Sequence, residues 1–342
     1  MLILLWLILS QTPAQTPWSM LGRYELTCPC CGQRFTTVSC TQSNTRGGID
    51  RDLFARAAGP QPVYYRIATC PRCGYSGYDS DFDANVTLPP DVRDKILKNP
   101  RLSLPEGFNP QSDPRELDAS KRYDLAIQCY RWRGKSEEAL GWLNLRASWI
   151  ARDSGSILPP DPRLRRVMEF VERWRPTMRP TDNQADVEMR MATHIAEALA
   201  TGRFNRYQRP YVELGLTLIL RQRGENRQAL PRLERLASYE PFADSLHEGI
   251  TRMRESIERE SHYQQEAAQY FERALLAKQI SPANRGAAQY LLGELLRRLG
   301  RDREAIGWYD QALRDSLIKP DQRAWAKEQR AWCAIMVDAN QG

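Results

Sequence analysis

Histidine is scarce in this chain, and that scarcity narrows the possible chemistry. The three histidines, His194, His247 and His262, share no motif, so neither a Ser-His-Asp triad nor an HExxH site can be assembled. Gly134-Lys135-Ser136 ends like a phosphate-binding loop, but Cys129 stands where such a loop requires glycine. We therefore predict that the protein is not an enzyme.

Lysine is also rare, because 42 of the 49 basic residues are arginine. The formal net charge of +7 permits an anionic partner without requiring one. The arginines alternate with acids, as in Arg301-Asp-Arg-Glu304, a pattern typical of a solvated helix face. Binding of nucleic acid is thus possible but less favoured than binding of protein.

The chain begins with a short apolar run at residues 2–9. A helix needs about 20 apolar residues to cross a bilayer, so this run predicts no stable membrane span. Small residues at Thr12 and Ala14 indicate a signal peptide at residues 1–14 and export to the periplasm. A true start at Met20 would instead leave the protein in the cytoplasm.

Two copies of one cysteine motif carry the clearest signal. Cys28 and Cys31 lie in Cys-Pro-Cys-Cys-Gly, and Cys70 and Cys73 lie in Cys-Pro-Arg-Cys-Gly. Two such turns facing each other supply four soft ligands in a tetrahedron, which is typical of a closed, structural Zn²⁺ site. A rubredoxin-like iron site has the same ligand spacing, and disulfides or a redox-active pair are the remaining alternatives.

The other cysteines are predicted to be free thiols, with two alternatives open: Cys30 could exchange with a neighbour in the first turn, and Cys40 could be a ligand or pair with Cys30. Cys40 follows the first turn on a predicted strand, and Cys129 and Cys333 lie in apolar helical patterns where a buried thiol is the usual outcome. Asp79, Asp81 and Asp83 alternate after the second turn, and we interpret them as a solvated loop.

Composition divides the rest of the chain into three parts. Residues 22–86 contain short β-like segments at 24–27, 34–38 and 63–69, which predict a zinc-ribbon-like module stabilised by its metal. Residues 87–119 are rich in proline and predict a linker with one short helix at 91–98. Residues 120–342 have helical periodicity throughout, including helices near 162–174 and 183–202, and we expect them to have a core of their own.

Part of the helical region repeats with a period of 38 residues. Each copy places small and large apolar residues on one face of a helix, preceded by a predicted break at Gly224, His262 or Gly300. The pattern predicts tetratricopeptide-like helix hairpins. The matching positions are Ala229, Ala267 and Ala305; Leu233, Phe271 and Tyr309; and Leu236, Ala274 and Ala312.

The fold class that follows is mostly α: a tetratricopeptide-like α-solenoid preceded by a small β-rich zinc-ribbon-like module. The two cysteine motifs, residues 123–130 and residues 142–149 resemble a bacterial family of uncharacterised proteins, domain of unknown function 2225. That resemblance covers about residues 22–240 and implies a cysteine module joined to tetratricopeptide-like helices. It implies no enzymatic activity.

We therefore expect an interaction scaffold, with a rubredoxin-like or thiol redox protein as an alternative. By resemblance to tetratricopeptide hairpins, the position eight residues before each repeated alanine faces a concave groove. Arginine occupies it in all three copies, which predicts a groove for an acidic or C-terminal peptide. The predicted groove residues are Arg221, Arg259 and Arg297, with Arg298 beside the last.

Overall fold

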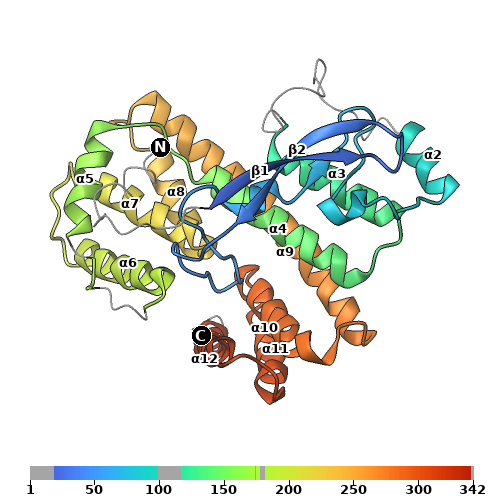
Figure 1. Cartoon of the computed structure of the whole chain (residues 1–342). Helices are drawn as coiled ribbons and strands as arrows, with labels where there is room; N and C mark the ends of the chain where they lie inside the picture. The colour runs from blue at the N-terminus through green and yellow to red at the C-terminus, as the bar shows by residue number, and fades with distance from the viewer. Residues whose placement is uncertain (1–18, 99–116, 174, 178–181, 340–342) are drawn as a thin grey trace.

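The computed structural model describes residues 19–98, 117–173, 175–177 and 182–339. The predicted signal peptide and most of the predicted linker lie outside these residues. In the described part, the chain is mostly helical, with two small two-stranded sheets near the N-terminus (Figure 1). None of the described helices combines the length and the apolar character that a membrane crossing requires.

Two β-hairpins form the N-terminal part. Strand β1 (Met20–Thr27) pairs antiparallel with β2 (Arg34–Gln42), and β3 (Ala68–Thr69) pairs with β4 (Ser76–Gly77). One cysteine motif forms the turn of each hairpin. The predicted strands at 24–27 and 34–38 are thus confirmed.

The segment expected as a third strand at 63–69 is mostly not a strand. Residues Pro62–Tyr65 form a 3₁₀ turn (η1), and only Ala68–Thr69 pairs in a sheet. The carbonyl groups of this segment instead accept hydrogen bonds from side chains of the helix at Ala119–Trp132. Tyr123 Oη donates to Val63 O at 3.0 Å, and Arg122 donates to the carbonyl oxygens of Tyr64 and Ile67. Tertiary contacts therefore replace the strand ladder that the residue types predict.

Eleven α-helices follow in the described residues. A short 3₁₀ turn, η2 (Asp79–Phe82), comes before them. The helices are α2 (Pro90–Lys98), α3 (Ala119–Trp132), α4 (Glu137–Gly155), α5 (Pro162–Glu172), α6 (Gln184–Ala200), α7 (Arg209–Gln222), α8 (Asn226–Ala237), α9 (Asp244–Leu276), α10 (Pro282–Arg298), α11 (Asp302–Arg314) and α12 (Pro320–Ala339). They confirm the predicted helices at 91–98, 162–174 and 183–202.

Helices α4 and α9 pack along each other at the centre of the molecule. Around this pair, α5–α8 form one group, the β-hairpins with α2 and α3 form a second, and α10–α12 form a third (Figure 1). Neighbouring helices contact each other in chain order from α6 to α12.

The 38-residue repeat marks buried positions in every copy. Ala229, Ala267 and Ala305 are all fully buried, and so are Leu233, Phe271 and Tyr309. Gly224 and Gly300 adopt positive φ angles of 77° and 80° and end α7 and α10, so the chain turns back into α8 and α11. The first and third copies are therefore helix hairpins.

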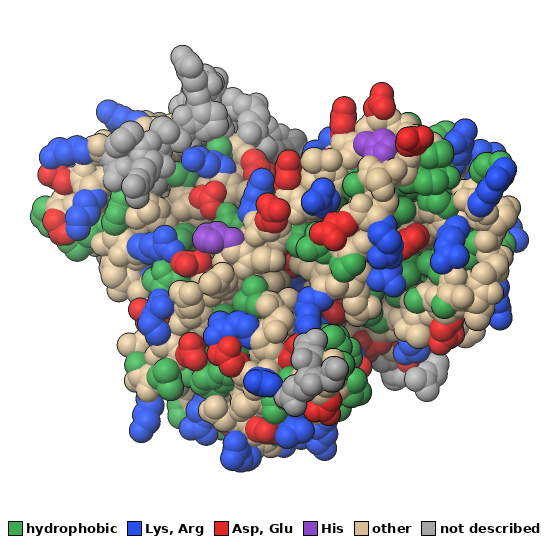
Figure 2. Space-filling view, turned by 180° about the vertical axis from the view of Figure 1, so that it is seen from behind, with side chains coloured by type: hydrophobic (Ala, Val, Ile, Leu, Met, Phe, Trp, Pro, Cys, Tyr) green, Lys and Arg blue, Asp and Glu red, His purple; other side chains and the backbone are tan. Residues whose placement is uncertain are grey.

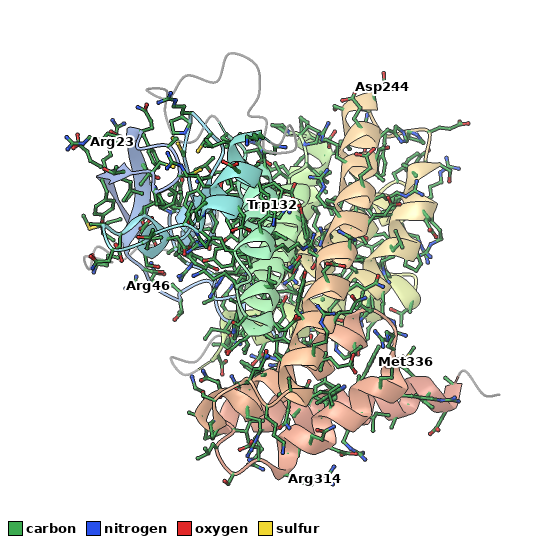
Figure 3. The ribbon with its side chains drawn as sticks, turned by 90° about the vertical axis from the view of Figure 1, so that its right-hand side faces the viewer. Arg23, Arg46, Trp132, Asp244, Arg314 and Met336 are labelled. Atoms are coloured by element: carbon green, nitrogen blue, oxygen red, sulfur yellow. The ribbon has the colours of Figure 1, made fainter. Side chains whose placement is uncertain are left out.

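The middle copy is different, because the predicted break at His262 is absent. Helix α9 continues for 33 residues through this position, as Figure 3 shows from Asp244 onward. His262 lacks the conformational freedom that allows glycine to end the helices of the other copies. In this copy the helix that packs against α9 is α4, which comes from a distant part of the chain and not from the preceding helix of a hairpin.

The N-terminal hairpins and the helices share hydrophobic cores. Phe54 and Ile67 belong to the same core cluster as Trp149 of α4, and the rings of Phe54 and Trp149 stack 5.1 Å apart. Cys28 and Cys70 belong to a second cluster with Leu125 of α3. The expectation that the helical part has a core of its own holds for two further clusters, which contain only helical-part residues such as Met191 and Leu233. It is corrected for α3 and α4, whose apolar faces are buried partly by residues 28–82.

Candidate metal centre

The two cysteine turns have the same backbone geometry. In the first turn Gly32 N donates to Cys28 O at 2.9 Å, and in the second Gly74 N donates to Cys70 O at 2.9 Å. Both glycines have φ near +74°, at 74° and 73°, where other residues are strained. The repeated motif thus builds the same local structure twice.

The two turns bring four sulfurs together. Cys28 Sγ lies 3.6 Å from Cys73 Sγ, Cys31 Sγ lies 3.6 Å from Cys70 Sγ, and all four are within 4.8 Å of one another. A Zn–S bond of about 2.3 Å places tetrahedral sulfurs about 3.8 Å apart, whereas a disulfide joins its sulfurs at about 2.0 Å. This spacing fits four thiolates around one metal ion and does not fit disulfides.

The cluster thiols are coupled through hydrogen bonds between their sulfurs. Hydrogen bonding with Cys28 and then with Cys73 lowers the pKa of Cys70. Hydrogen bonding with Cys70 raises the pKa of Cys28, and hydrogen bonding with Cys28 raises that of Cys73. Because a metal binds thiolates, ion binding would displace the remaining protons, and affinity should weaken as the pH falls.

The remaining cysteines lie outside the cluster as free thiols. Cys30 is buried, with its sulfur 3.9 Å from the Arg93 carbonyl oxygen, and Cys40 lies half-buried on β2. Cys129 and Cys333 are fully buried, which confirms their prediction. Cys129 lies directly behind the second turn, where its sulfur accepts a hydrogen bond from Ser76 N at 3.5 Å.

The second turn is anchored to α3 through Asp81. The interpretation of residues 79–83 as a solvated loop is wrong at Asp81, which is only 4% exposed. Its carboxylate accepts from Tyr130 Oη at 2.5 Å and from Arg133 Nη1 at 2.7 Å. Burial opposes ionisation, but these donors outweigh it and lower the pKa of Asp81. Tyr75, directly after the turn, donates to the Asp81 carbonyl oxygen at 3.2 Å.

The segment that links the two cysteine motifs enters the helical body. We call residues 43–61 the interknuckle loop. Tyr290 of α10 donates to the Arg51 carbonyl oxygen at 2.6 Å, and Asn183, just before α6, exchanges hydrogen bonds of 2.9 Å with the backbone of Ile49. Helices distant in sequence therefore contact this loop directly.

Two acids of the interknuckle loop lie in a buried cluster of arginines. Asp50 accepts from Arg56 at 3.0 Å and from Arg223 at 2.7 Å. Asp52 accepts a hydrogen bond of 3.3 Å from Arg152 Nη1 and lies 3.5 Å from Arg298 Nη1. Burial opposes ionisation of both acids, yet the surrounding guanidinium groups lower the pKa of each.

Acids from the helices complete the cluster. Glu260 of α9 pairs with Arg152 and Arg221, and its pKa is lowered despite burial. Glu294 of α10 pairs with Arg297 and Arg298 at 2.8 and 2.7 Å. The cluster therefore connects the interknuckle loop to α4, α7, α9 and α10 through charges that are shielded from water.

The predicted arginine groove is corrected by this arrangement. Arg221, Arg297 and Arg298 are 0%, 2% and 6% exposed, so they point into the molecule and face its own acids. Arg259 lies on the exposed side of α9 and does not join them. Arg221 and Arg297 do occupy equivalent positions in the first and third copies of the repeat. Both side chains are buried because the interknuckle loop, Glu260 and Glu294 cover them.

Local sequence patterns did not predict this buried cluster. Arginine next to aspartate and glutamate usually indicates a solvated helix face. One feature of the sequence does point to burial: Asp50 and Asp52 have apolar neighbours, with Ile49 before them and Leu53-Phe54 after them. Acids within an apolar run can indicate burial beside a counter-charge.

The fold and the site define a helical protein with a four-cysteine cluster that could hold a metal ion. Residues 21–209 and 249–334 match the family described as "Uncharacterized protein conserved in bacteria (DUF2225)", and the chain belongs to this family. No curated protein and no solved structure matches the chain.

The buried carboxylates predict a loss of stability in acid. Burial alone would raise the pKa of Glu294, but Arg297 and Arg298 lower it to about 2, from an ordinary value of 4.5. A carboxylate with a depressed folded pKa stabilises the protein above its unfolded pKa, and this stability is lost as the pH falls through the folded pKa. Urea unfolding should therefore show the free energy of unfolding falling steadily from about pH 5 towards pH 2. A flat profile over this range would contradict the arrangement.

Proposed function

We propose that this protein is a non-enzymatic scaffold that binds a protein or peptide partner and is organised by a structural zinc ion. The observation that carries the proposal is the closed set of four thiols from Cys28, Cys31, Cys70 and Cys73. Four protein ligands fill a tetrahedral zinc, which leaves no position for a substrate or a reactive water. The metal ion would thus stabilise the fold and take no part in a reaction.

The helices support the scaffold part of the proposal. Antiparallel hairpins α7–α8 and α10–α11 carry the same buried positions 76 residues apart, as in Ala229 and Ala305. We interpret them as tetratricopeptide-like hairpins in a short solenoid, interrupted where α9 continues without a turn. Stacked hairpins expose extended helix faces, and such faces commonly bind peptides.

The distribution of charge favours a protein partner over nucleic acid. Several arginines that make the sequence basic are buried against acids, among them Arg152 and Arg221. On the face drawn in Figure 2, basic and acidic side chains are interspersed. Nucleic acid is usually bound by a surface of predominantly positive charge.

Metal analysis and partner capture test this function together. The purified full chain should contain about one zinc per molecule and be colourless, because iron–thiolate centres are coloured. Immobilised full-length protein should retain one partner from a bacterial lysate, and the two purified proteins should then bind saturably in isothermal titration calorimetry.

The matched variants are Cys70→Ser, which removes a ligand, and Cys40→Ser, which removes a thiol outside the cluster. We expect the first to lose metal and partner and the second to retain both. Catalytic turnover of a small molecule that a single substitution abolishes would overturn the scaffold proposal.

A further inference from the structure

A cleft of about 190 Å³ lies between α6, α7 and α8. Its apolar lining comes from the last turns of α6, and its charged lining comes from the start of α7 and the second half of α8. The lining residues are Ala196, Leu199, Ala200, Arg209, Glu213, Arg232 and Arg235.

The cleft has an excess of positive charge. Arg235 is paired with Glu213, the only acid in the lining. Among the described residues, the Arg232 side chain donates only to the Gln228 carbonyl oxygen, at 2.7 Å. The Arg209 side chain has no hydrogen-bond or ion-pair partner there; only its backbone N–H donates, to Asn205 O at 3.0 Å. A guanidinium group offers five N–H donors, so most donors of Arg209 and Arg232 are available to a ligand.

We propose that this cleft binds a carboxylate of a partner peptide together with the small aliphatic side chain next to it. The inference rests on the proposed scaffold function and assigns it a binding site. Two guanidinium groups without acidic partners match a carboxylate, because planar N–H donors can bind both of its oxygens. The Ala196, Leu199 and Ala200 surface provides the apolar contact.

The size of the cleft favours a peptide end or a single side chain. Pockets for drug-sized ligands and cofactors occupy about 300–1,000 Å³, and this cleft holds about 190 Å³. Glu213, Arg232 and Arg235 lie between the two stretches that match the family, residues 21–209 and 249–334. The site is therefore proposed for this chain and not for the family.

Fluorescence anisotropy with three short labelled peptides tests the inference on the full-length, metal-loaded protein. One peptide ends in Ala-Val with a free carboxylate, the second is its C-terminal amide, and the third is an amide with Asp-Ala near its end. We expect the first or the third to bind saturably and the second not to bind. The comparison shows whether the carboxylate comes from a C-terminus or from a side chain.

A double variant and a matched control locate the binding. Arg209→Gln with Arg232→Gln should raise Kd about tenfold or more, because hydrogen bonds to charged groups are lost. Arg254→Gln with Arg303→Gln removes the same charge from exposed positions on α9 and α11 and should change Kd by less than about twofold. Circular dichroism should show that both variants are folded.

Several outcomes would overturn the inference. These are equal binding of the peptide without a carboxylate, equal weakening by both double variants, or displacement of the peptide by an equal concentration of inorganic phosphate. If no peptide binds while the native partner is still captured, the cleft assignment fails and the scaffold proposal stands. If the peptides bind but no partner is found, the scaffold proposal fails and the cleft remains a carboxylate site.

Discussion

Replacing Asp52 with asparagine should lower the free energy of unfolding by about 3–5 kcal/mol, the usual cost of removing one partner from a buried ion pair. The side chain is completely buried and faces Arg152 and Arg298. Asparagine preserves the size but not the charge, so two buried guanidinium groups lose a counter-ion. Urea unfolding of the metal-loaded protein at neutral pH measures the difference.

A matched control is Glu304→Gln, which also converts an acid to its amide. Glu304 pairs with Arg301 on the surface of α11, where the two side chains are 51% and 40% exposed. Exposed ion pairs stabilise proteins little, so this variant should unfold close to the unmodified protein. Equal effects of the two substitutions would show that the buried cluster does not stabilise the fold.

Removing the metal should loosen the helical body as well as the cysteine turns. The metal would hold together the two cysteine turns that flank the interknuckle loop, and this loop carries Asp50 and Asp52 into the arginine cluster. At a free zinc concentration 1,000 times Kd, binding contributes about 4 kcal/mol to the free energy of unfolding. A chelator, or Cys70→Ser, should therefore cause a large decrease in the melting temperature.

Hydrogen exchange distinguishes this result from local loosening at the cysteines. We expect faster exchange in the interknuckle loop and also in α4 near Arg152, which lies under Asp52. Cys40→Ser should leave both regions protected, since Cys40 is outside the cluster. Faster exchange confined to the cysteine turns would show that the helical core is independent of the metal.

Local sequence patterns predicted much of the fold. The spacing of the cysteine motifs and their glycines predicted the four-sulfur cluster, because two identical turns suffice to build it. The 38-residue repeat predicted buried positions such as Ala267 and Phe271 correctly even where the hairpin geometry differs. Helical periodicity reports which face of a helix is buried, whatever element covers that face.

Local patterns could not predict whether the arginine side chains point into the molecule or into solvent. Arg221 and Arg297 occupy helical positions that suit a solvated face as well as a buried ion pair. Their burial depends on Glu260, Glu294 and Glu225, and the cluster they join depends on Asp52, which is 100 positions from Arg152 in the chain. No local pattern records which distant acid will lie beside a given arginine.

The sequence by itself determined the cysteine turns, the helices and their buried faces, because these follow from residue type and spacing within a few turns of chain. Only the tertiary structure decided that α9 runs unbroken beside α4 and that the interknuckle loop fills the arginine cluster. Both outcomes depend on packing between distant segments. A buried charge is stable only where another part of the fold brings its counter-charge within a few ångströms.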